Sequence, residues 1–177
     1  MSWQTQLKGD PLPWLLETES PGVRYLALRD LGLAKNASEL RTARETAHTQ
    51  GPIAAILAEM DKQGYWAKPG PGYLPKYRST VWSVIMLAQL GASVEQDKRI
   101  ARACAYVLDH ALTAGGHFSA SGAPSGTADC LQGNLCWALA ELGCDDVRLE
   151  SAFEWMARSV TGEGVAPVQD KQAAVRY

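Results

Sequence analysis

Two apolar patterns alternate along the second half of the chain. The stretch 80–90 is apolar on almost every side of a helix, so it predicts a core helix that protein surrounds on all faces. The stretch 97–112 keeps its apolar residues on one face and its charges opposite, which predicts an outer helix. The same two patterns recur at 130–143 and 147–160, where the last segment has a predicted inward stripe of Leu149, Phe153, Met156 and Val160.

Proline marks three predicted helix starts in the first third of the chain. A capping residue followed by proline favours a first helical turn, because the missing N–H of proline is not needed there. Such pairs predict helices from about residues 11, 21 and 52, at Asp10-Pro11, Ser20-Pro21 and Gly51-Pro52. Asn36 with Glu39 predicts a capping box for a further helix over about 38–48.

An internal repeat organises these segments. Inner segments end in Leu-Gly and outer segments are followed by glycine turns, at spacings of about fifty residues: Gly32, Gly91 and Gly143 for the ends, and Gly64, Gly116 and Gly162 for the turns. Each unit is an αα-hairpin whose inner helix cannot be buried alone, so successive hairpins must stack. The prediction is an all-α fold of stacked αα-hairpin repeats forming a partial α/α toroid, a single domain over 1–177 that is incomplete at its C-terminal edge.

Composition and charge restrict the classes of partner that the sequence supports. With 177 residues, 46% of them hydrophobic, one domain can bury a sizeable core. The formal net charge of -2, with both signs interspersed, argues against nucleic acid and against an anionic membrane surface. The polar start, and the lack of any run of about eighteen apolar residues, predict a cytoplasmic protein without a membrane span. The four cysteines, at 104, 130, 136 and 144, are expected to be reduced thiols.

Four segments carry a resemblance to known proteins. They resemble a bacterial group of uncharacterised, squalene-cyclase-like toroid proteins, and they read DPLPWLLETESPGVRYLALRDL, YLPKYRSTVWSVIMLAQLGA, YVLDHALTAGGHFSASG and CLQGNLCWALAELG. The hairpin repeats with Gly-x-aromatic turns are also similar to the α/α toroid of the terpenoid cyclases and protein prenyltransferases. The resemblance implies that fold, with an apolar central cavity for an isoprenoid-like or lipid-like molecule.

The catalytic motifs of those enzymes are missing from the sequence. Cyclases that protonate an alkene carry a DxDD motif, but the Asp145-Asp146 pair begins an outer helix, where capping is its expected role. The prenyltransferases hold zinc with an aspartate, a cysteine two residues later and a histidine on a later helix. Here Asp129 and Cys130 are adjacent, and no histidine follows His117. We therefore expect no metal and no cofactor, and the sequence favours a non-catalytic protein without deciding whether a reaction occurs.

A loop rich in aromatic and basic residues precedes the predicted core helix. Its candidate binding residues are Trp66, Tyr73, Tyr77 and Arg78, with Lys76 between the two tyrosines. They bring aromatic surface and positive charge to the electropositive end of that helix, where an anionic head group could bind. The structural alternative is that the aromatic residues fasten the loop to the hairpin while the basic side chains are solvated or ion-paired.

Further candidates lie on the inner segments and in one turn. Trp82 and Trp137 are expected either to line an apolar cavity or to belong to the ordinary core. His117 is the histidine nearest the expected mouth of that cavity. Asn134 interrupts an apolar run and, if buried, must bond to a loop carbonyl or to a ligand, while Gly133 beside it predicts close helix packing.

Two functional hypotheses remain open. In the first, the protein binds an apolar, isoprenoid-like or lipid-like small molecule in a central cavity, which requires Tyr77, Trp82, Asn134 and Trp137 to converge on one void. In the second, it is a non-catalytic helical-repeat scaffold that binds another protein, and side chains fill the centre. The apolar flank 130–139 at the predicted open edge further predicts either a homodimer or a C-terminal tail folded over that edge.

Overall fold

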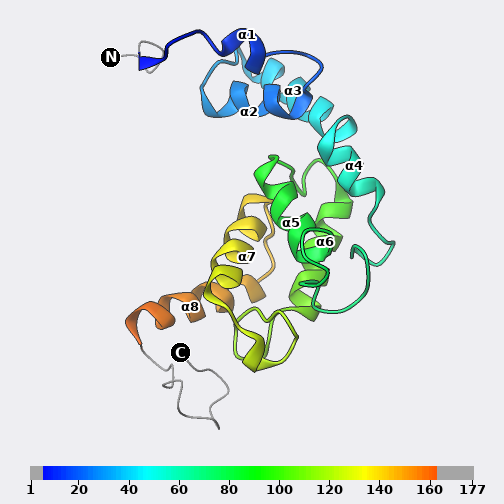
Figure 1. Ribbon diagram of the computed structural model, residues 1–177, viewed down its shortest axis with the longest axis vertical. Helices are drawn as coiled ribbons and strands as arrows, with labels where there is room; N and C mark the ends of the chain where they lie inside the picture. The colour runs from blue at the N-terminus through cyan, green and yellow to red at the C-terminus, as the bar shows by residue number, and fades with distance from the viewer. Residues whose placement is uncertain (1–5, 163–177) are drawn as a thin grey trace. The chain divides into compact units, whose positions relative to one another are not determined.

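The computed structural model describes residues 6–162, and this range is all-α (Figure 1). The helices are α1 (Leu12–Leu15), α2 (Pro21–Asp30), α3 (Ala37–Thr49), α4 (Pro52–Ala58), α5 (Thr80–Gln89), α6 (Lys98–His110), α7 (Asp129–Glu141) and α8 (Arg148–Thr161), with a short 3₁₀ turn η2 at Pro124–Gly126. No β-strand occurs in residues 6–162 beyond two isolated bridges. The predicted all-α class is confirmed, whereas the predicted C-terminal tail lies outside the described residues.

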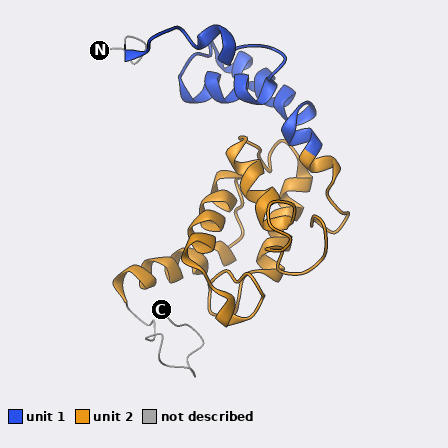
Figure 2. Ribbon diagram, viewed as in Figure 1, with its two compact units in different colours: residues 1–55 blue, residues 56–177 orange. Residues whose placement is uncertain are grey.

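The chain divides into two compact units, residues 1–55 and residues 56–177 (Figure 2). In the first unit α2 packs along α3. The three proline-marked starts are confirmed, because α1, α2 and α4 begin at Leu12, Pro21 and Pro52. The predicted cap of α3 is confirmed as well, since Asn36 Oδ1 accepts a hydrogen bond from the Glu39 N–H at 2.9 Å. Glu39 departs from a capping box by accepting from the N–H of Lys35, at 2.9 Å, instead of that of Asn36.

The second unit is built on the packing of α5 against α7. Each of these helices also packs against the helix that follows it, α5 against α6 and α7 against α8. Their fully buried side chains are mainly aliphatic and include Val84, Leu87, Ile100, Leu135 and Leu139. The four helices therefore pack as two contacting pairs, α5 with α6 and α7 with α8, joined through α5 and α7 around one apolar core.

Three helices end with the same hydrogen bond. In each, the N–H after the terminal glycine donates to a carbonyl in the last helical turn, the bond that defines a Schellman motif. The three bonds run from Leu33 to Leu28, from Ala92 to Leu87 and from Cys144 to Leu139, at 3.2, 3.0 and 2.9 Å. The Leu-Gly pairs of the sequence thus mark three helix C-termini that share the same hydrogen bond.

The expectation that protein surrounds α5 on all faces is wrong. Trp82 is half-buried, Met86 is 42% exposed and Gln89 is exposed. Positions four and three residues apart lie on one side of a helix, so these three form a single open stripe along α5. Apolar character alone did not reveal the stripe, because Trp82 and Met86 are as hydrophobic as the buried residues around them.

The predicted inward stripe of α8 is also wrong in part. Phe153 is 40% exposed and Val160 is 84% exposed. The buried side of α8 is instead formed by Leu149, Ala152 and Trp155. The ring of Trp155 packs against that of His117, with centroids 5.4 Å apart, so this side of α8 contacts the turn before α7.

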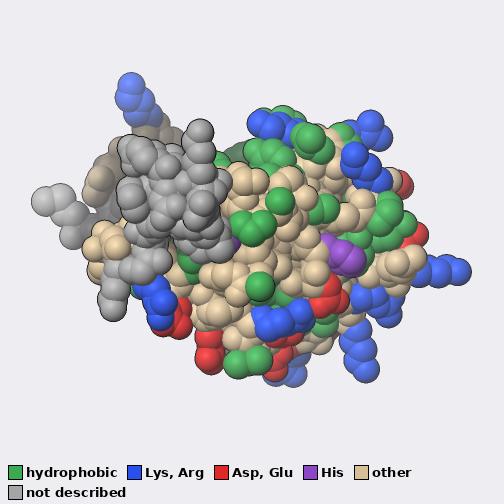
Figure 3. Space-filling model, turned by 90° about the horizontal axis from the view of Figure 1, so that it is seen from below, with side chains coloured by type: hydrophobic (Ala, Val, Ile, Leu, Met, Phe, Trp, Pro, Cys, Tyr) green, Lys and Arg blue, Asp and Glu red, His purple; other side chains and the backbone are tan. Residues whose placement is uncertain are grey.

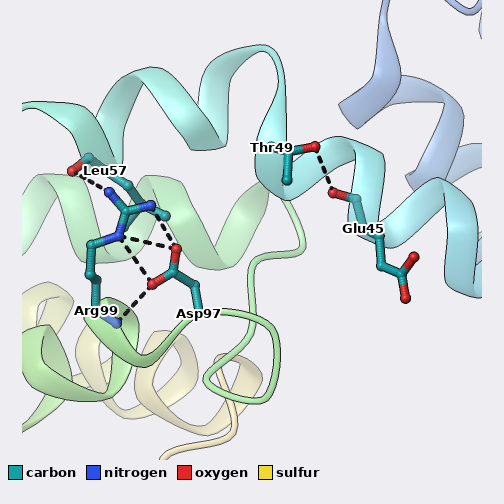
Figure 4. Close-up of polar contacts among 5 residues, drawn as sticks. All are labelled: Glu45, Thr49, Leu57, Asp97 and Arg99. Carbon is teal, nitrogen blue, oxygen red and sulfur yellow. Dashed lines mark hydrogen bonds and ion pairs between the residues drawn. The ribbon is translucent and has the colours of Figure 1, made fainter.

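Arg99 fastens the start of α6 to the end of α4 (Figure 4). Its guanidinium donates to the carbonyl of Leu57 at 3.2 Å and pairs with the carboxylate of Asp97 at 2.7 Å. Asp97 Oδ1 also accepts the N–H of Arg99 at 2.8 Å, which caps the start of α6. In the first unit, the same view shows the Thr49 hydroxyl donating to the carbonyl of Glu45, one turn earlier in α3, at 3.1 Å.

Acidic and basic side chains are interspersed on the face drawn in Figure 3. This distribution agrees with the mixed charge of the sequence, whose formal net value is -2. Within residues 6–162, no helix has both the length and the apolar character that crossing a bilayer demands.

Candidate functional site

Three of the predicted site residues form an aromatic cluster at the start of α5. The ring centroids of Tyr73 and Trp82 lie 5.4 Å apart, and those of Tyr77 and Trp82 lie 4.9 Å apart. The indole N–H of Trp82 donates to the carbonyl of Tyr73 at 2.8 Å, which fixes the ring. Lys76 Nζ lies 5.6 Å from the centroid of Tyr73, within cation–π range. Because Tyr77 is 71% exposed, the cluster presents an aromatic surface to solvent.

Gly72 holds the loop before α5 in place. Its carbonyl oxygen accepts hydrogen bonds from the hydroxyl of Ser79 at 2.6 Å and from the N–H of Val81 at 3.0 Å. The Val81 N–H is one of the groups that a helix N-terminus leaves without an intrahelical partner. The loop therefore uses part of the electropositive end of α5 itself, which leaves less of it for an anion than the sequence suggested.

A pocket of about 270 Å³ contains two further predicted residues, Trp66 and Arg78. Its other lining residues are Ile56, Glu59, Ala67 and Ser83. Trp66 is buried, and two hydrogen bonds fix it: its backbone N–H donates to Thr80 Oγ1 at 3.1 Å and its indole N–H to the Ile56 carbonyl at 2.7 Å. Arg78 is exposed, and within residues 6–162 its guanidinium has no ion-pair or hydrogen-bond partner. The pocket thus combines a rigid aromatic wall with a free cation.

His117 lies in the core and not at a surface mouth. Its side chain is 1% exposed, with Nδ1 3.1 Å from the hydroxyl of Thr113 and Nε2 3.3 Å from the carbonyl oxygen of Pro124. A carbonyl can only accept, so the proton is on Nε2 and Nδ1 accepts from Thr113. Burial lowers the pKa of His117, and the hydrogen bond to Pro124 opposes that shift only in part. This environment is that of a neutral histidine in a protein interior.

The two candidates on α7 face outward. Asn134 is exposed and Trp137 is 44% exposed. The buried polar residue of α7 is Gln132, which the sequence reasoning missed. A signal for it existed, because Gln132 precedes Leu135 and Leu139 by three and seven residues and so shares their apolar face.

The eight predicted residues therefore lie in separate places. Tyr73 and Tyr77 each pack against Trp82, and Trp66 and Arg78 line one pocket. The remaining three do not join them, since His117 is in the core while Asn134 and Trp137 are on the exposed side of α7. The convergence on one void that the cavity hypothesis requires is not seen among the described residues.

The pocket places charged and polar groups beside an apolar wall. Arg78 contributes a cation, Glu59 a carboxylate and Ser83 a hydroxyl around an apolar wall. Within the described part of the chain, no three His, Cys, Asp or Glu side chains come together as metal ligands would. Comparison of the chain with models of protein families, with curated proteins and with solved structures finds no match. The resemblance to toroid proteins consequently stays a prediction.

Proposed function

We propose that the protein is a non-catalytic binding module for a small amphiphile, an isoprenoid-like or lipid-like chain with one acidic group. The ligand contacts Trp66 with its apolar part and Arg78 with its acidic group. The observation that carries the proposal is the guanidinium of Arg78, which lines a pocket of about 270 Å³ without a partner among the described residues. An unpaired guanidinium beside a fixed indole suits a carboxylate attached to an apolar chain.

The charge of the pocket restricts the ligand. Glu59 lines the same pocket as Arg78, so a second negative charge on the ligand would be repelled. A monoanion is favoured over a dianion such as a fully ionised phosphate monoester. The volume of about 270 Å³ holds the head of such a molecule and part of its chain. The exposed rings of Tyr77 and Trp82 are a surface for the rest of the chain.

Dodecanoate is the probe that tests the proposal, and dodecanol is its neutral match. Titration followed by tryptophan fluorescence is expected to show binding of dodecanoate and weaker binding of dodecanol. Arg78→Gln should weaken dodecanoate about fivefold, the worth of a partly exposed charge pair, and leave dodecanol unchanged. Glu59→Gln should strengthen dodecanoate by removing the repulsion.

Lys76→Gln is the matched control. It removes a positive charge two residues from Arg78, but the ammonium of Lys76 lies over the ring of Tyr73 and does not line the pocket. The affinity of the Lys76→Gln variant for dodecanoate should stay within about twofold of that of the natural chain. Equal losses in the two variants would mean that general charge, and not the pocket, attracts the anion, and would overturn the proposal.

We also propose that the hairpins stack as a partial α/α toroid. Two glycine contacts support it, because each turn that precedes a helix pair in the second unit packs on the second helix of that pair. A Cβ added to Gly64 would lie 2.8 Å from the carbonyl oxygen of Arg102 on α6, and one added to Gly116 would lie 2.9 Å from that of Ser151 on α8. The three identical Schellman bonds at helix ends support it further.

The second candidate function is a helical-repeat scaffold whose partner is another protein, with a second copy of this chain as the first to test. One observation favours it: Trp137, on the exposed side of α7, is 44% exposed, within the flank expected to form a homodimer. Native mass spectrometry of the purified chain separates the candidates. A dimer that Trp137→Ser dissociates would support the scaffold, whereas a monomer that retains an amphiphile of a few hundred daltons would support the binding module.

A further inference from the structure

Two cysteines from different helix pairs line one small pocket in the second unit. Cys104 lies in the middle of α6 and is 1% exposed, while Cys144 follows the turn that ends α7 and is half-buried. Both line a pocket of about 130 Å³, together with Val94, Ala101, Ala105, Gly143, Asp145 and Asp146. Through this pocket a small solute in water can reach the sulfur of Cys144.

The backbone holds both cysteines in place. The N–H of Cys144 donates to the carbonyl of Leu139 at 2.9 Å, and the carbonyl of Leu142, two residues before Cys144, accepts the N–H of Val94 at 2.9 Å. The turn is thereby fastened at both its ends, and Cys104 is fixed by the helix around it. Two thiols that line one small pocket on fixed backbone have the proximity from which a disulfide can form.

The two side chains are close enough to influence each other's titration. The contact with Cys104 lowers the pKa of Cys144 in spite of its partial burial. The neighbouring charges of Asp145 and Asp146 act in the opposite direction. The same contact and burial raise the pKa of Cys104. Of the two thiols, Cys144 is therefore the one that ionises first, and the thiolate is the form that reacts with oxidants.

We infer that Cys104 and Cys144 form a reversible dithiol–disulfide site, with hydrogen peroxide as the oxidant. The Cys144 thiolate attacks one oxygen of the peroxide, its O–O bond breaks, and the products are a sulfenic acid and hydroxide, which takes up a proton to become water. The Cys104 sulfur then attacks the sulfenic sulfur, the S–O bond breaks, and hydroxide leaves with the proton of Cys104 as a second water. Two thiols lose two electrons and two protons, and one peroxide becomes two waters.

The disulfide has a structural consequence. It joins α6 to the turn between α7 and α8 and closes a loop of about forty residues, so it constrains the unfolded chain strongly. The oxidised protein should unfold about 5–10 °C above the reduced protein. Cys130 and Cys136 are outside this site, since Cys130 is exposed on α7 and Cys136 is buried beside Gln132.

The test is peptide mapping after treatment with a slight excess of hydrogen peroxide. All four cysteines lie between Arg102 and Arg148 with no lysine or arginine between those two, so trypsin leaves them in one fragment. Chymotrypsin cuts after Tyr106, Phe118 and Trp137, which puts Cys104 and Cys144 in different peptides and leaves Cys130 and Cys136 together in a third. The expected result is one crosslinked pair, with Cys104 in one peptide and Cys144 in the other, which a thiol reductant reverses together with the rise in unfolding temperature.

Serine variants give the controls. Cys130→Ser should leave the crosslink and the temperature shift unchanged, although Cys130 is more exposed than the other three cysteines. Cys104→Ser should abolish both, while a sulfenic-acid reagent still labels Cys144 after peroxide treatment and does not label the buried Cys136, which a misfolded chain would expose. Further oxidation of Cys144 to sulfinic acid in the natural chain, a crosslink through Cys130, or no reaction with peroxide would each overturn the inference.

Discussion

The side chain of Gln132 accepts the backbone N–H of Phe118 at 2.7 Å, inside the core of the second unit. The same amide donates to the carbonyl of Ala152 on α8 at 2.9 Å. One buried residue on α7 thus connects the turn before α7 with the helix after it. The bond matters because Phe118 is 0% exposed, so water cannot replace Gln132 as the acceptor for its N–H.

Replacing Gln132 with leucine should destabilise the protein by about 2–3 kcal/mol, because the buried N–H of Phe118 is left without an acceptor. Urea unfolding followed by tryptophan fluorescence measures the change. Asn134→Leu is the matched control, since Asn134 is exposed on the same helix, and it should change the free energy of unfolding by less than about 0.5 kcal/mol. Equal effects of the two variants would contradict the assignment of the inward face of α7.

The contrast between these two residues shows where prediction from sequence succeeds and fails. Helix positions were predictable because local chemistry decides them: prolines begin α2 and α4, and Leu-Gly ends α5 and α7. Which side of a helix turns inward depends on neighbouring elements. The sequence indicates Asn134 as the polar residue that could be buried in this apolar run. The packing of α7 on α5 and α8 buries Gln132 instead.

The candidate site was predictable as a set of residue types and not as a geometry. The loop before α5 takes its shape from hydrogen bonds between residues seven and fourteen positions apart, Gly72 with Ser79 and Trp66 with Thr80. No periodic pattern encodes such pairs. The same is true of Cys104 and Cys144, which are forty residues apart in sequence and line one pocket.

Stability should depend on pH through His117. Its pKa is lowered in the folded protein from the usual 6.5, so below that pH the unfolded chain binds more protons than the folded one. The free energy of unfolding should therefore fall as the pH drops from 7 through 6.5 toward 5. The carboxyl groups with lowered pKa values affect stability at lower pH, because the ordinary pKa values from which they are lowered are 4.5 for Glu39 and 3.8 for Asp146.

Urea unfolding of the variant His117→Gln at a series of pH values checks this assignment. Glutamine keeps a donor and an acceptor but has no charge to gain, so the slope between pH 7 and pH 5 should disappear. His110→Gln removes an exposed histidine and should retain the slope. A slope that survives in the His117 variant would mean that another group causes it.

Alanine at Gly116 should be strongly destabilising. Gly116 has a φ of 83°, and a Cβ there would lie 2.9 Å from the backbone oxygen of Ser151, so both the conformation and the contact oppose a side chain. The expected loss is about 3 kcal/mol in urea unfolding. Gly162→Ala isolates the conformational part, because Gly162 has a φ of 76° with nothing within 4 Å of an added Cβ, and it should cost only about 1 kcal/mol.

Alanine at Gly133 should have the opposite sign. The sequence suggested that this glycine allows close helix packing, but nothing lies within 4 Å of a Cβ placed there, so that interpretation is wrong. Gly133 lies inside α7, where glycine is less favourable than alanine by about 1 kcal/mol, because the unfolded chain has more freedom at glycine. Gly133→Ala should therefore raise the free energy of unfolding by about 0.5–1 kcal/mol. Gly133 lies on the exposed side of α7 together with Trp137. If Gly133→Ala instead lowered the free energy of unfolding, this side of α7 would pack against another copy of the chain in solution. The sedimentation profile of the variant would then shift toward the monomer.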